Sequence, residues 1–269
     1  MILSSGFPGA SPLAFGLTAL VAYAFTVWSP SWLARRAVPV LLAGVLSHAA
    51  MLLVEIGSIG WHGGAARLGF GPVLSLTACL ALAVHAFESR LLVHPTVRRT
   101  LAAAGFLGVV LAWTFPGEAR VLGSAWAPWH WMLGVGSYGL FAVAVVHGLL
   151  LDAAERRLRL RTPGVVGAPG VPLLQLERIT FRFVAAGFAV LSAAIALGGL
   201  TTAQWRWDHK TLLSLVGWLI FALLLAGRHW RGWRGRQATT WLYAGALVLL
   251  LAYAGTRFVL EVLLHRTAS

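Results

Sequence analysis

Long apolar runs separated by short polar connections make up almost the whole chain. Eight of these runs have about the 20 residues that a helix needs to cross a bilayer. They lie near residues 10–29, 37–57, 69–87, 99–116, 127–151, 180–202, 209–228 and 239–264. They lack the apolar and polar alternation of barrel strands, and backbone inside a bilayer must satisfy its own hydrogen bonds. The sequence therefore predicts an all-α, polytopic transmembrane helix bundle of about eight spans.

Composition supports a membrane protein over a soluble one. The 269 residues are 59% hydrophobic and 11% charged, whereas a soluble domain carries about a quarter charged residues. Residues 1–10 lack the basic start of a cleaved signal peptide, so we expect the first run to remain as a span. Cys79 is the only cysteine, which excludes a disulfide within the chain. We expect residues 1–269 to form a single integral membrane domain.

Basic residues orient the predicted helices. The net charge of +13 comes mainly from Arg in short runs between apolar stretches, a pattern that favours a lipid bilayer as partner and not nucleic acid. One set of alternate connections holds fourteen Lys and Arg residues and the other holds five, so the positive-inside rule places both termini in the periplasm. The longest connection, residues 152–179, lies on the basic side and is predicted to be a cytoplasmic linker loop. These features predict a multi-pass protein of the bacterial inner membrane.

Two aromatic segments fall at the predicted outer face. One is Trp205-Arg206-Trp207-Asp208-His209-Lys210, which leads into the seventh run, and the other is Trp126-Ala127-Pro128-Trp129-His130-Trp131, which leads into the fifth. Bilayer interfaces attract Trp, and Asp208 is suited to cap the following helix, so an aromatic belt is the simpler explanation of the indoles. That explanation does not account for His130.

Several ionisable residues are predicted to lie within the bilayer. His48 stands near the middle of the second run without a charged neighbour within one turn, so a functional and a structural role stay equally open, and we count it among the candidate cofactor-binding residues. Arg257 and Glu261 are one turn apart in the last run and are expected to neutralise one another. Weaker candidates lie nearer the interfaces or in loops: His62, His85, His94, His147 and His229.

A second histidine, His265, ends the last run at the predicted membrane level of His130. If these rings approached one another, their imidazoles could supply both axial positions of a haem iron, with Arg206 or Lys210 near the propionates. His130 and His265 are therefore the candidate metal ligands. The sequence has no zinc-type cluster of His or Cys, no nucleophile elbow and no Gly-rich phosphate loop, so hydrolase and nucleotide-binding functions have little support.

At these residues the chain resembles a known family. The segment from Trp205 to Ala222 is similar to the tryptophan-rich WWD signature and following helix of cytochrome c assembly proteins of the CcsA, CcmC and CcmF type. The helix that begins at His130 looks like the external-histidine helix of that superfamily, and the likeness is nearest to its smaller YpjD/HemX-like branch, best over about 120–265. The resemblance implies haem binding at the outer membrane face, with His130 as an external axial ligand. It also implies a haem-facing element made of Trp205, Trp207 and Asp208.

The chain also departs from the family pattern. Residues 201–204 lack the upstream Trp and Gly of the full signature, and Ala226 stands where the CcsA pattern has a membrane histidine. His265 is displaced by about one residue from the second external histidine. The resemblance thus implies retained haem binding more strongly than covalent haem attachment, and favours an assembly factor over a complete haem lyase.

Three function classes remain open on the sequence. The leading one is a haem-binding or haem-delivering component of cytochrome c assembly, whose partners would be apocytochrome c or other assembly components. A small-solute or ion transporter would use His48, Arg257 and Glu261 to line a pathway. A noncatalytic membrane regulator of haem biosynthesis would act through the Arg-rich inner loops.

Overall fold

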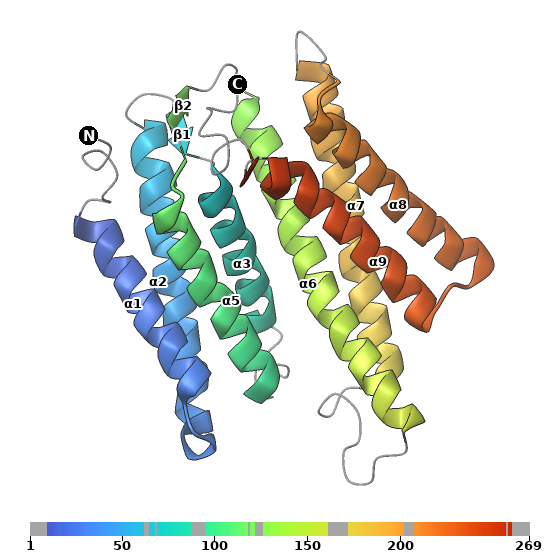
Figure 1. Cartoon of the computed structure of the whole chain (residues 1–269), viewed down its shortest axis with the longest axis horizontal. Helices are drawn as coiled ribbons and strands as arrows, with labels where there is room; N and C mark the ends of the chain where they lie inside the picture. The colour runs from blue at the N-terminus through green and yellow to red at the C-terminus, as the bar shows by residue number, and fades with distance from the viewer. Residues whose placement is uncertain are drawn as a thin grey trace. The chain divides into compact units, whose positions relative to one another are not determined.

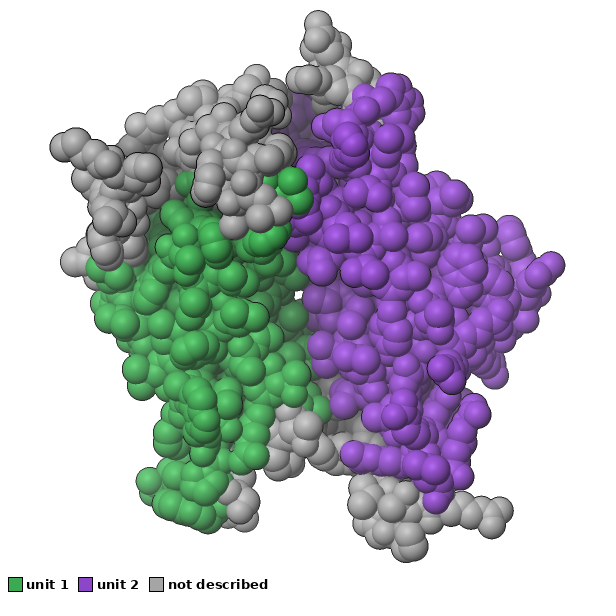
Figure 2. Space-filling model, in the orientation of Figure 1, with its two compact units in different colours: residues 1–125, 257–269 green, residues 126–256 purple. Residues whose placement is uncertain are grey.

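The computed structural model describes most of the chain. The described residues are 10–61, 65–67, 69–87, 95–117, 119–121, 126–160, 172–201, 207–256 and 258–259. Contacts divide the chain into two compact units, which Figure 2 shows in different colours. Unit 1 comprises residues 1–125 and 257–269, and unit 2 comprises residues 126–256. That residues 1–269 form one membrane domain stays a prediction, so each unit is described by itself.

The described chain is almost entirely helical, as predicted. It holds eight α-helices, and each overlaps one of the eight predicted runs. Within the described residues, six helical segments are long and apolar enough to cross a membrane. The shorter apolar helices Pro12–Trp28 and Phe70–Ala86 account for the other two runs. The chain is therefore a multi-pass, all-helical membrane protein.

Unit 1 is built from four helices, α1 (Ala10–Trp28), α2 (Ala34–Trp61), α3 (Phe70–Phe87) and α5 (Pro95–Thr114). In Figure 1, α1 packs against α2 and α5, and α3 packs against α5. A short 3-10 turn, Ser31–Leu33, links α1 to α2 because Pro30 stops the first helix. The unit is thus a small helical bundle.

A small antiparallel strand pair joins two loops of unit 1. Strand β1 (Ala65–Arg67) pairs with β2 (Ala119–Val121), with Ala66 opposite Arg120. The apolar pattern did not predict these strands, because three residues are too few to show a period of two. They tie the connection between α2 and α3 to the connection that follows α5.

The core of unit 1 surrounds Tyr23, which is fully buried on α1. A Cβ added at Gly105 on α5 would lie 2.8 Å from this ring, and one added at Gly44 on α2 would lie 3.2 Å from it. Any larger residue at these two positions would displace the ring. The glycines therefore let three helices close around one aromatic side chain.

Unit 2 is a second helical bundle. It comprises α6 (Ala127–Arg159), α7 (Leu173–Thr201), α8 (His209–Arg231), α9 (Gly235–Leu250) and the π-helix η2 (Leu251–Gly255). Helix α6 runs beside α7 and also packs against α9, while α8 and α9 form an antiparallel hairpin (Figure 1). The hairpin turn begins at Gly232, whose φ of +66° is a left-handed conformation that favours glycine.

The core of unit 2 is aromatic and aliphatic. Phe141 of α6 stacks on Phe221 of α8 with ring centroids 3.9 Å apart, and Val184, Leu224 and Leu242 pack into the same cluster. Offset or stacked aromatic pairs add stability beyond the apolar area that they bury. This cluster joins all four helices of the unit and fixes where their ends lie.

Two predicted boundaries differ from the structure. Helix α6 continues to Arg159 and α7 begins at Leu173, so both ends of the predicted 152–179 loop are helical. Hydropathy marks where a helix leaves the apolar layer, and a polar Arg-rich segment without Gly or Pro can continue the helix beyond that point. The last predicted run, 239–264, is interrupted, since α9 gives way to the π-helix at Leu251.

Candidate functional site

His130 lies in the first turn of α6 and is half-buried. Its Nδ1 atom is 2.9 Å from the backbone carbonyl oxygen of Ala194 on α7. A carbonyl can only accept, so Nδ1 carries the proton and donates it, which leaves the lone pair on Nε2. Among the described residues, none forms a hydrogen bond with Nε2. A histidine held in this way presents Nε2 in the form that binds a metal.

Helix α7 shapes the space around the His130 ring. Gly198 is one turn beyond Ala194, and a Cβ added there would lie 2.9 Å from Cε1 and 3.2 Å from Nδ1 of the imidazole. Any other residue at position 198 would therefore clash with the imidazole ring. One turn of α7 thus supplies both the hydrogen-bond acceptor and the room that orient His130.

Exposed indole side chains lie beside this histidine in the sequence and just before the start of α8. Trp126 and Trp129 are 57% and 58% exposed, and Trp207, before the start of α8, is 68% exposed. All three lie outside the buried core of unit 2. An aromatic belt at the bilayer interface and a flat-sided ligand are the two partners that exposed indoles suit.

Asp208 is the N-cap of α8, as its position in the sequence predicted. Its carboxylate accepts a hydrogen bond from the backbone N–H of Thr211 at 2.8 Å. This cap satisfies a donor that the first turn would otherwise leave free and fixes where α8 begins. It thereby sets the directions of the flanking residues Trp207 and Lys210.

Lys210 links the start of α8 to the π-helix. Its Nζ lies over the Tyr253 ring, 5.4 Å from the centroid, and Tyr253 meets the edge of Tyr138. The Tyr138 hydroxyl donates to the carbonyl oxygen of Leu249 at 2.6 Å, where α9 gives way to the π-helix. We call this end of unit 2, where α6 and α8 begin and α7 ends, the His130 end.

His48 is placed very differently, in the fully buried core of unit 1. Its Nδ1 is 3.1 Å from the Tyr23 hydroxyl, and its Nε2 is 2.7 Å from the Ser75 hydroxyl. Both ring nitrogens are therefore used inside the protein, whichever tautomer is present. A metal could bind His48 only if one of these hydrogen bonds broke.

The remaining predicted site residues are either elsewhere or outside the described part of the chain. His85 and His147 are buried, and the Nδ1 of each lies within hydrogen-bond distance of a carbonyl of its own helix. His147 is about 25 Å along α6 from His130 by the rise of an α-helix. These predicted residues lie outside the described residues: His62, His94, Trp205, Arg206, Arg257, Glu261 and His265.

The sequence alone did not identify Ala194, Gly198 or Tyr253. Ala194 contributes only a carbonyl, and Gly198 contributes only the absence of a side chain, so neither carries a chemical signal in one sequence. Their importance follows from packing between residues far apart in the sequence, such as His130 and Ala194, which are 64 positions apart. The only sequence signal for Ala194 and Gly198 is that two small residues stand one turn apart on an apolar helix.

The chemistry of these donors fits a metal that brings most of its own ligands. Among the described residues there is no group of three or more His, Cys, Asp and Glu side chains that could hold a metal ion. A porphyrin supplies four nitrogens and needs only axial ligands, and one oriented imidazole can fill an axial position. Exposed indoles and the Lys210 ammonium suit the ring faces and carboxylates of such a ligand.

The family assignment rests on nearly the whole chain. The family model described as "Cytochrome C assembly protein" matches residues 14–264, which include all of unit 2 and most of unit 1. The chain belongs to this family. The match covers His130 and the whole of the described His130 end, so the geometry above is that of a cytochrome c assembly protein.

Individual relatives agree with the family match. The chain is 32% identical to an uncharacterized 28.8 kDa protein of Azospirillum brasilense, over 83% of this chain and 84% of that protein. It is 26% identical to the inner membrane protein YpjD of Escherichia coli K12, over 93% and 98% of the two chains. It is 33% identical to the cytochrome c biogenesis protein CcsA of Nostoc punctiforme, but over only 31% of this chain and 25% of that protein. No solved structure matches the chain significantly.

Proposed function

We propose that this cytochrome c assembly protein binds haem at the His130 end and presents it for transfer to apocytochrome c or another assembly component. The observation that carries the proposal is the hydrogen bond from His130 Nδ1 to the Ala194 carbonyl, which leaves Nε2 free to bind iron. Haem would supply the iron and the vinyl groups of the later chemistry. The role of the protein is to bind, orient and release it.

Each neighbouring group has a role in this proposal. Trp207, with Trp205 before it in the sequence, would lie against the faces of the macrocycle, and Asp208 would hold the start of α8 in place. Lys210 would attract the propionates, because a charge-assisted contact favours carboxylates. His265 is the proposed second axial ligand, since it closes the last apolar run at the level predicted for His130. His48 has both nitrogens engaged and is proposed to be structural, not an iron ligand.

The membrane orientation belongs to the same proposal. Eight spans with both termini in the periplasm of a bacterial inner membrane put the His130 end on the periplasmic side. The charges of unit 2 support this assignment, since seven exposed arginines lie at the opposite helix ends. The protein would act as an assembly factor and not as a complete haem lyase.

Haem content of the purified protein tests the proposal. The full chain is produced under haem sufficiency and purified in detergent, and its Soret absorption and pyridine haemochrome are measured. We expect bound haem in the wild type and a loss of about tenfold or more in His130→Ala, because an axial ligand is removed. His229→Ala, an exposed histidine at the other end of α8, is the matched control and should keep its haem. Wild-type protein without a Soret band, or His130→Ala with unchanged haem content, contradicts the proposal.

A further inference from the structure

Arginines crowd the end of unit 2 opposite His130. Here α6 ends, α7 begins, and α8 turns into α9. Seven arginines at these helix ends are exposed, and none of them forms an ion pair with a described residue. We call them the arginine surface: Arg156, Arg157, Arg159, Arg178, Arg231, Arg234 and Arg236. Seven positive charges at one end of the unit favour binding of an anionic partner.

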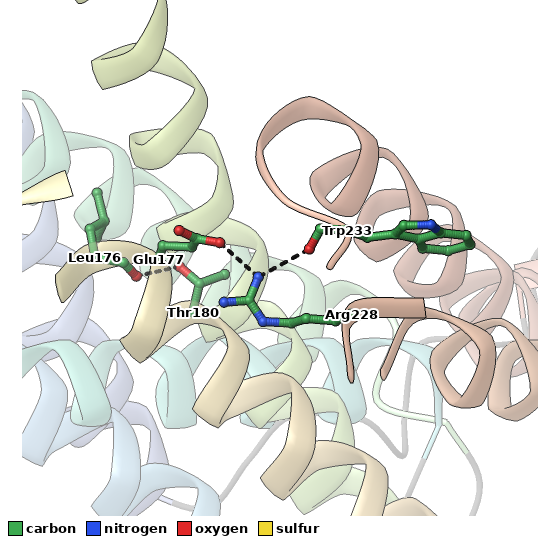
Figure 3. A network of polar contacts seen from close by, with 5 residues as sticks. All are labelled: Leu176, Glu177, Thr180, Arg228 and Trp233. Atoms are coloured by element: carbon green, nitrogen blue, oxygen red, sulfur yellow. Dashed lines mark hydrogen bonds and ion pairs between the residues drawn. The ribbon is translucent and has the colours of Figure 1, made fainter. Parts of the chain in front are cut away.

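An eighth arginine at this end is used internally. Arg228 pairs with Glu177 across α8 and α7 at 2.7 Å, and its guanidinium lies 3.9 Å from the centroid of the Phe181 ring. The same guanidinium reaches the carbonyl of Trp233 in the hairpin turn (Figure 3). The Glu177 side chain is only 12% exposed and pairs with Arg228, so it does not neutralise the exposed arginines. This network also fixes the end of α8 against the start of α7.

Asp152 and Glu155, the other two carboxylates at this end, both lie against α9. Asp152 accepts hydrogen bonds from the hydroxyls of Thr239 and Tyr243, at 2.9 and 2.8 Å. Glu155 lies against the first residue of α9, since a Cβ added at Gly235 would be 3.1 Å from its Oε1. These contacts join the end of α6 to the start of α9. The Asp152 carboxylate is thereby engaged within the fold and not by the exposed arginines.

Exposed apolar side chains alternate with the arginines. Leu158 and Leu160 beside Arg159 are 58% and 70% exposed, Leu174 is 70% exposed, and Trp230 beside Arg231 is 80% exposed. A dissolved polyanion such as nucleic acid offers nothing to cover Leu side chains at helix ends. A lipid offers both a phosphate and acyl chains, and Trp favours the boundary between them.

We propose that the arginine surface binds the phosphodiester headgroups of anionic phospholipids in the adjacent leaflet. All seven cations are Arg, whose planar guanidinium can form two parallel hydrogen bonds to one phosphate. Leu158, Leu160 and Trp230 contact the glycerol and acyl region of the same lipids. The internal contacts of Arg228 and Asp152 keep the four helix ends in place for this binding. The site is independent of haem, since its residues lie at the opposite end of unit 2.

Native mass spectrometry of the detergent-purified full chain tests this proposal. Phosphatidylglycerol and phosphatidylcholine with identical acyl chains are titrated onto delipidated protein, and lipid adducts are counted. We expect several-fold more adducts with phosphatidylglycerol. The substitution Arg236→Gln should lower the apparent affinity of the protein for phosphatidylglycerol about fivefold. The triple variant Arg231→Gln/Arg234→Gln/Arg236→Gln should lower this affinity further. These variants leave the contacts of Arg228 and Asp152 intact, and a melting curve checks that they fold.

Matched variants and competitors separate this site from general electrostatics. Arg36→Gln removes one exposed positive charge from unit 1 and should leave phosphatidylglycerol binding unchanged. Equal adducts with the two lipids, or an equal loss in Arg36→Gln and Arg236→Gln, would overturn the proposal. Complete competition by millimolar inorganic phosphate would identify a site for soluble anions, and competition by a short RNA at low salt would identify a nucleic-acid site. Both results would overturn the proposal as well.

Discussion

Two histidines in the two units show how differently one side chain can be used in a membrane protein. In unit 1, His48 is fully buried and both of its ring nitrogens face hydroxyls, those of Tyr23 and Ser75. In unit 2, His130 is half-buried, and a backbone carbonyl engages only Nδ1. A satisfied imidazole holds helices together, whereas an imidazole with a fixed tautomer and an open nitrogen is prepared for a ligand.

Depth in an apolar run does not by itself distinguish a structural histidine from a ligand. An ionisable residue in the middle of an apolar run is a reasonable functional candidate, because burying it is costly. In unit 1 that cost is offset by two hydroxyl partners on neighbouring helices, which a single sequence does not reveal. His130, nearer the helix end, has only Nδ1 engaged, and it is the histidine that we propose as the iron ligand.

The largest expected effect is on stability, from His48→Ala. This change leaves the hydroxyls of Tyr23 and Ser75 without a partner in a buried site, and each unsatisfied group costs about 1–3 kcal/mol. The melting temperature in detergent should fall clearly, while haem per folded molecule stays constant. His130→Ala should do the reverse, with haem lost and the melting temperature of the haem-free protein nearly unchanged. If His48→Ala melted like wild type and lost its haem, the division of roles would be wrong.

The next effect concerns the space beside His130. Gly198→Ala places a methyl group where the imidazole lies, so the ring must turn away from the Ala194 carbonyl. We expect a fall of roughly tenfold in haem affinity, as is typical when a metal-ligating histidine loses its orienting partner. Gly134→Ala is the control, because a Cβ at this position of α6 has nothing within 4 Å among the described atoms. Haem titration measures the haem affinity of each variant. Equal haem affinities in Gly198→Ala and Gly134→Ala would refute the orienting role of α7.

The smallest effect concerns the cap of α8. Asp208→Ala removes the acceptor of the Thr211 N–H and should lower stability by about 1 kcal/mol. Asp208→Asn keeps a good cap but removes the charge, so it should preserve both stability and haem content. Thermal melts followed by circular dichroism, together with haem content, separate the two. A variant Asp208→Asn that melts normally but loses its haem would show that the carboxylate acts on the ligand directly.

The sequence predicted the elements of the fold better than their ends. All eight apolar runs became helices, and the Asp208 cap lies where its residue type and position placed it. The helical extension to Arg159 was not predicted, because hydropathy reports the bilayer boundary and not the last hydrogen bond of a helix. The π-helix was not predicted either, since residues 246–254, where α9 gives way to it, contain no Pro or Gly.

The sequence predicted the histidine of the candidate site but not the residues that orient it. His130 was identified because an aromatic belt does not explain an imidazole and because its helix resembles the external-histidine helix of the family. The partners that prepare it, Ala194 and Gly198, act through a carbonyl and an absent side chain. Residue types that carry no reactive group acquire a role only when the fold brings two helices together.

Chemical rescue tests the central claim, that His130 binds haem iron through Nε2, most directly. His130→Gly removes the imidazole and leaves a space in the first turn of α6, and free imidazole is then added to the purified, haem-titrated protein. The account predicts that His130→Gly has a weak Soret band, which imidazole restores toward the wild-type position and intensity. The same imidazole should leave wild-type protein unchanged. A wild-type spectrum in His130→Gly without imidazole would contradict the account.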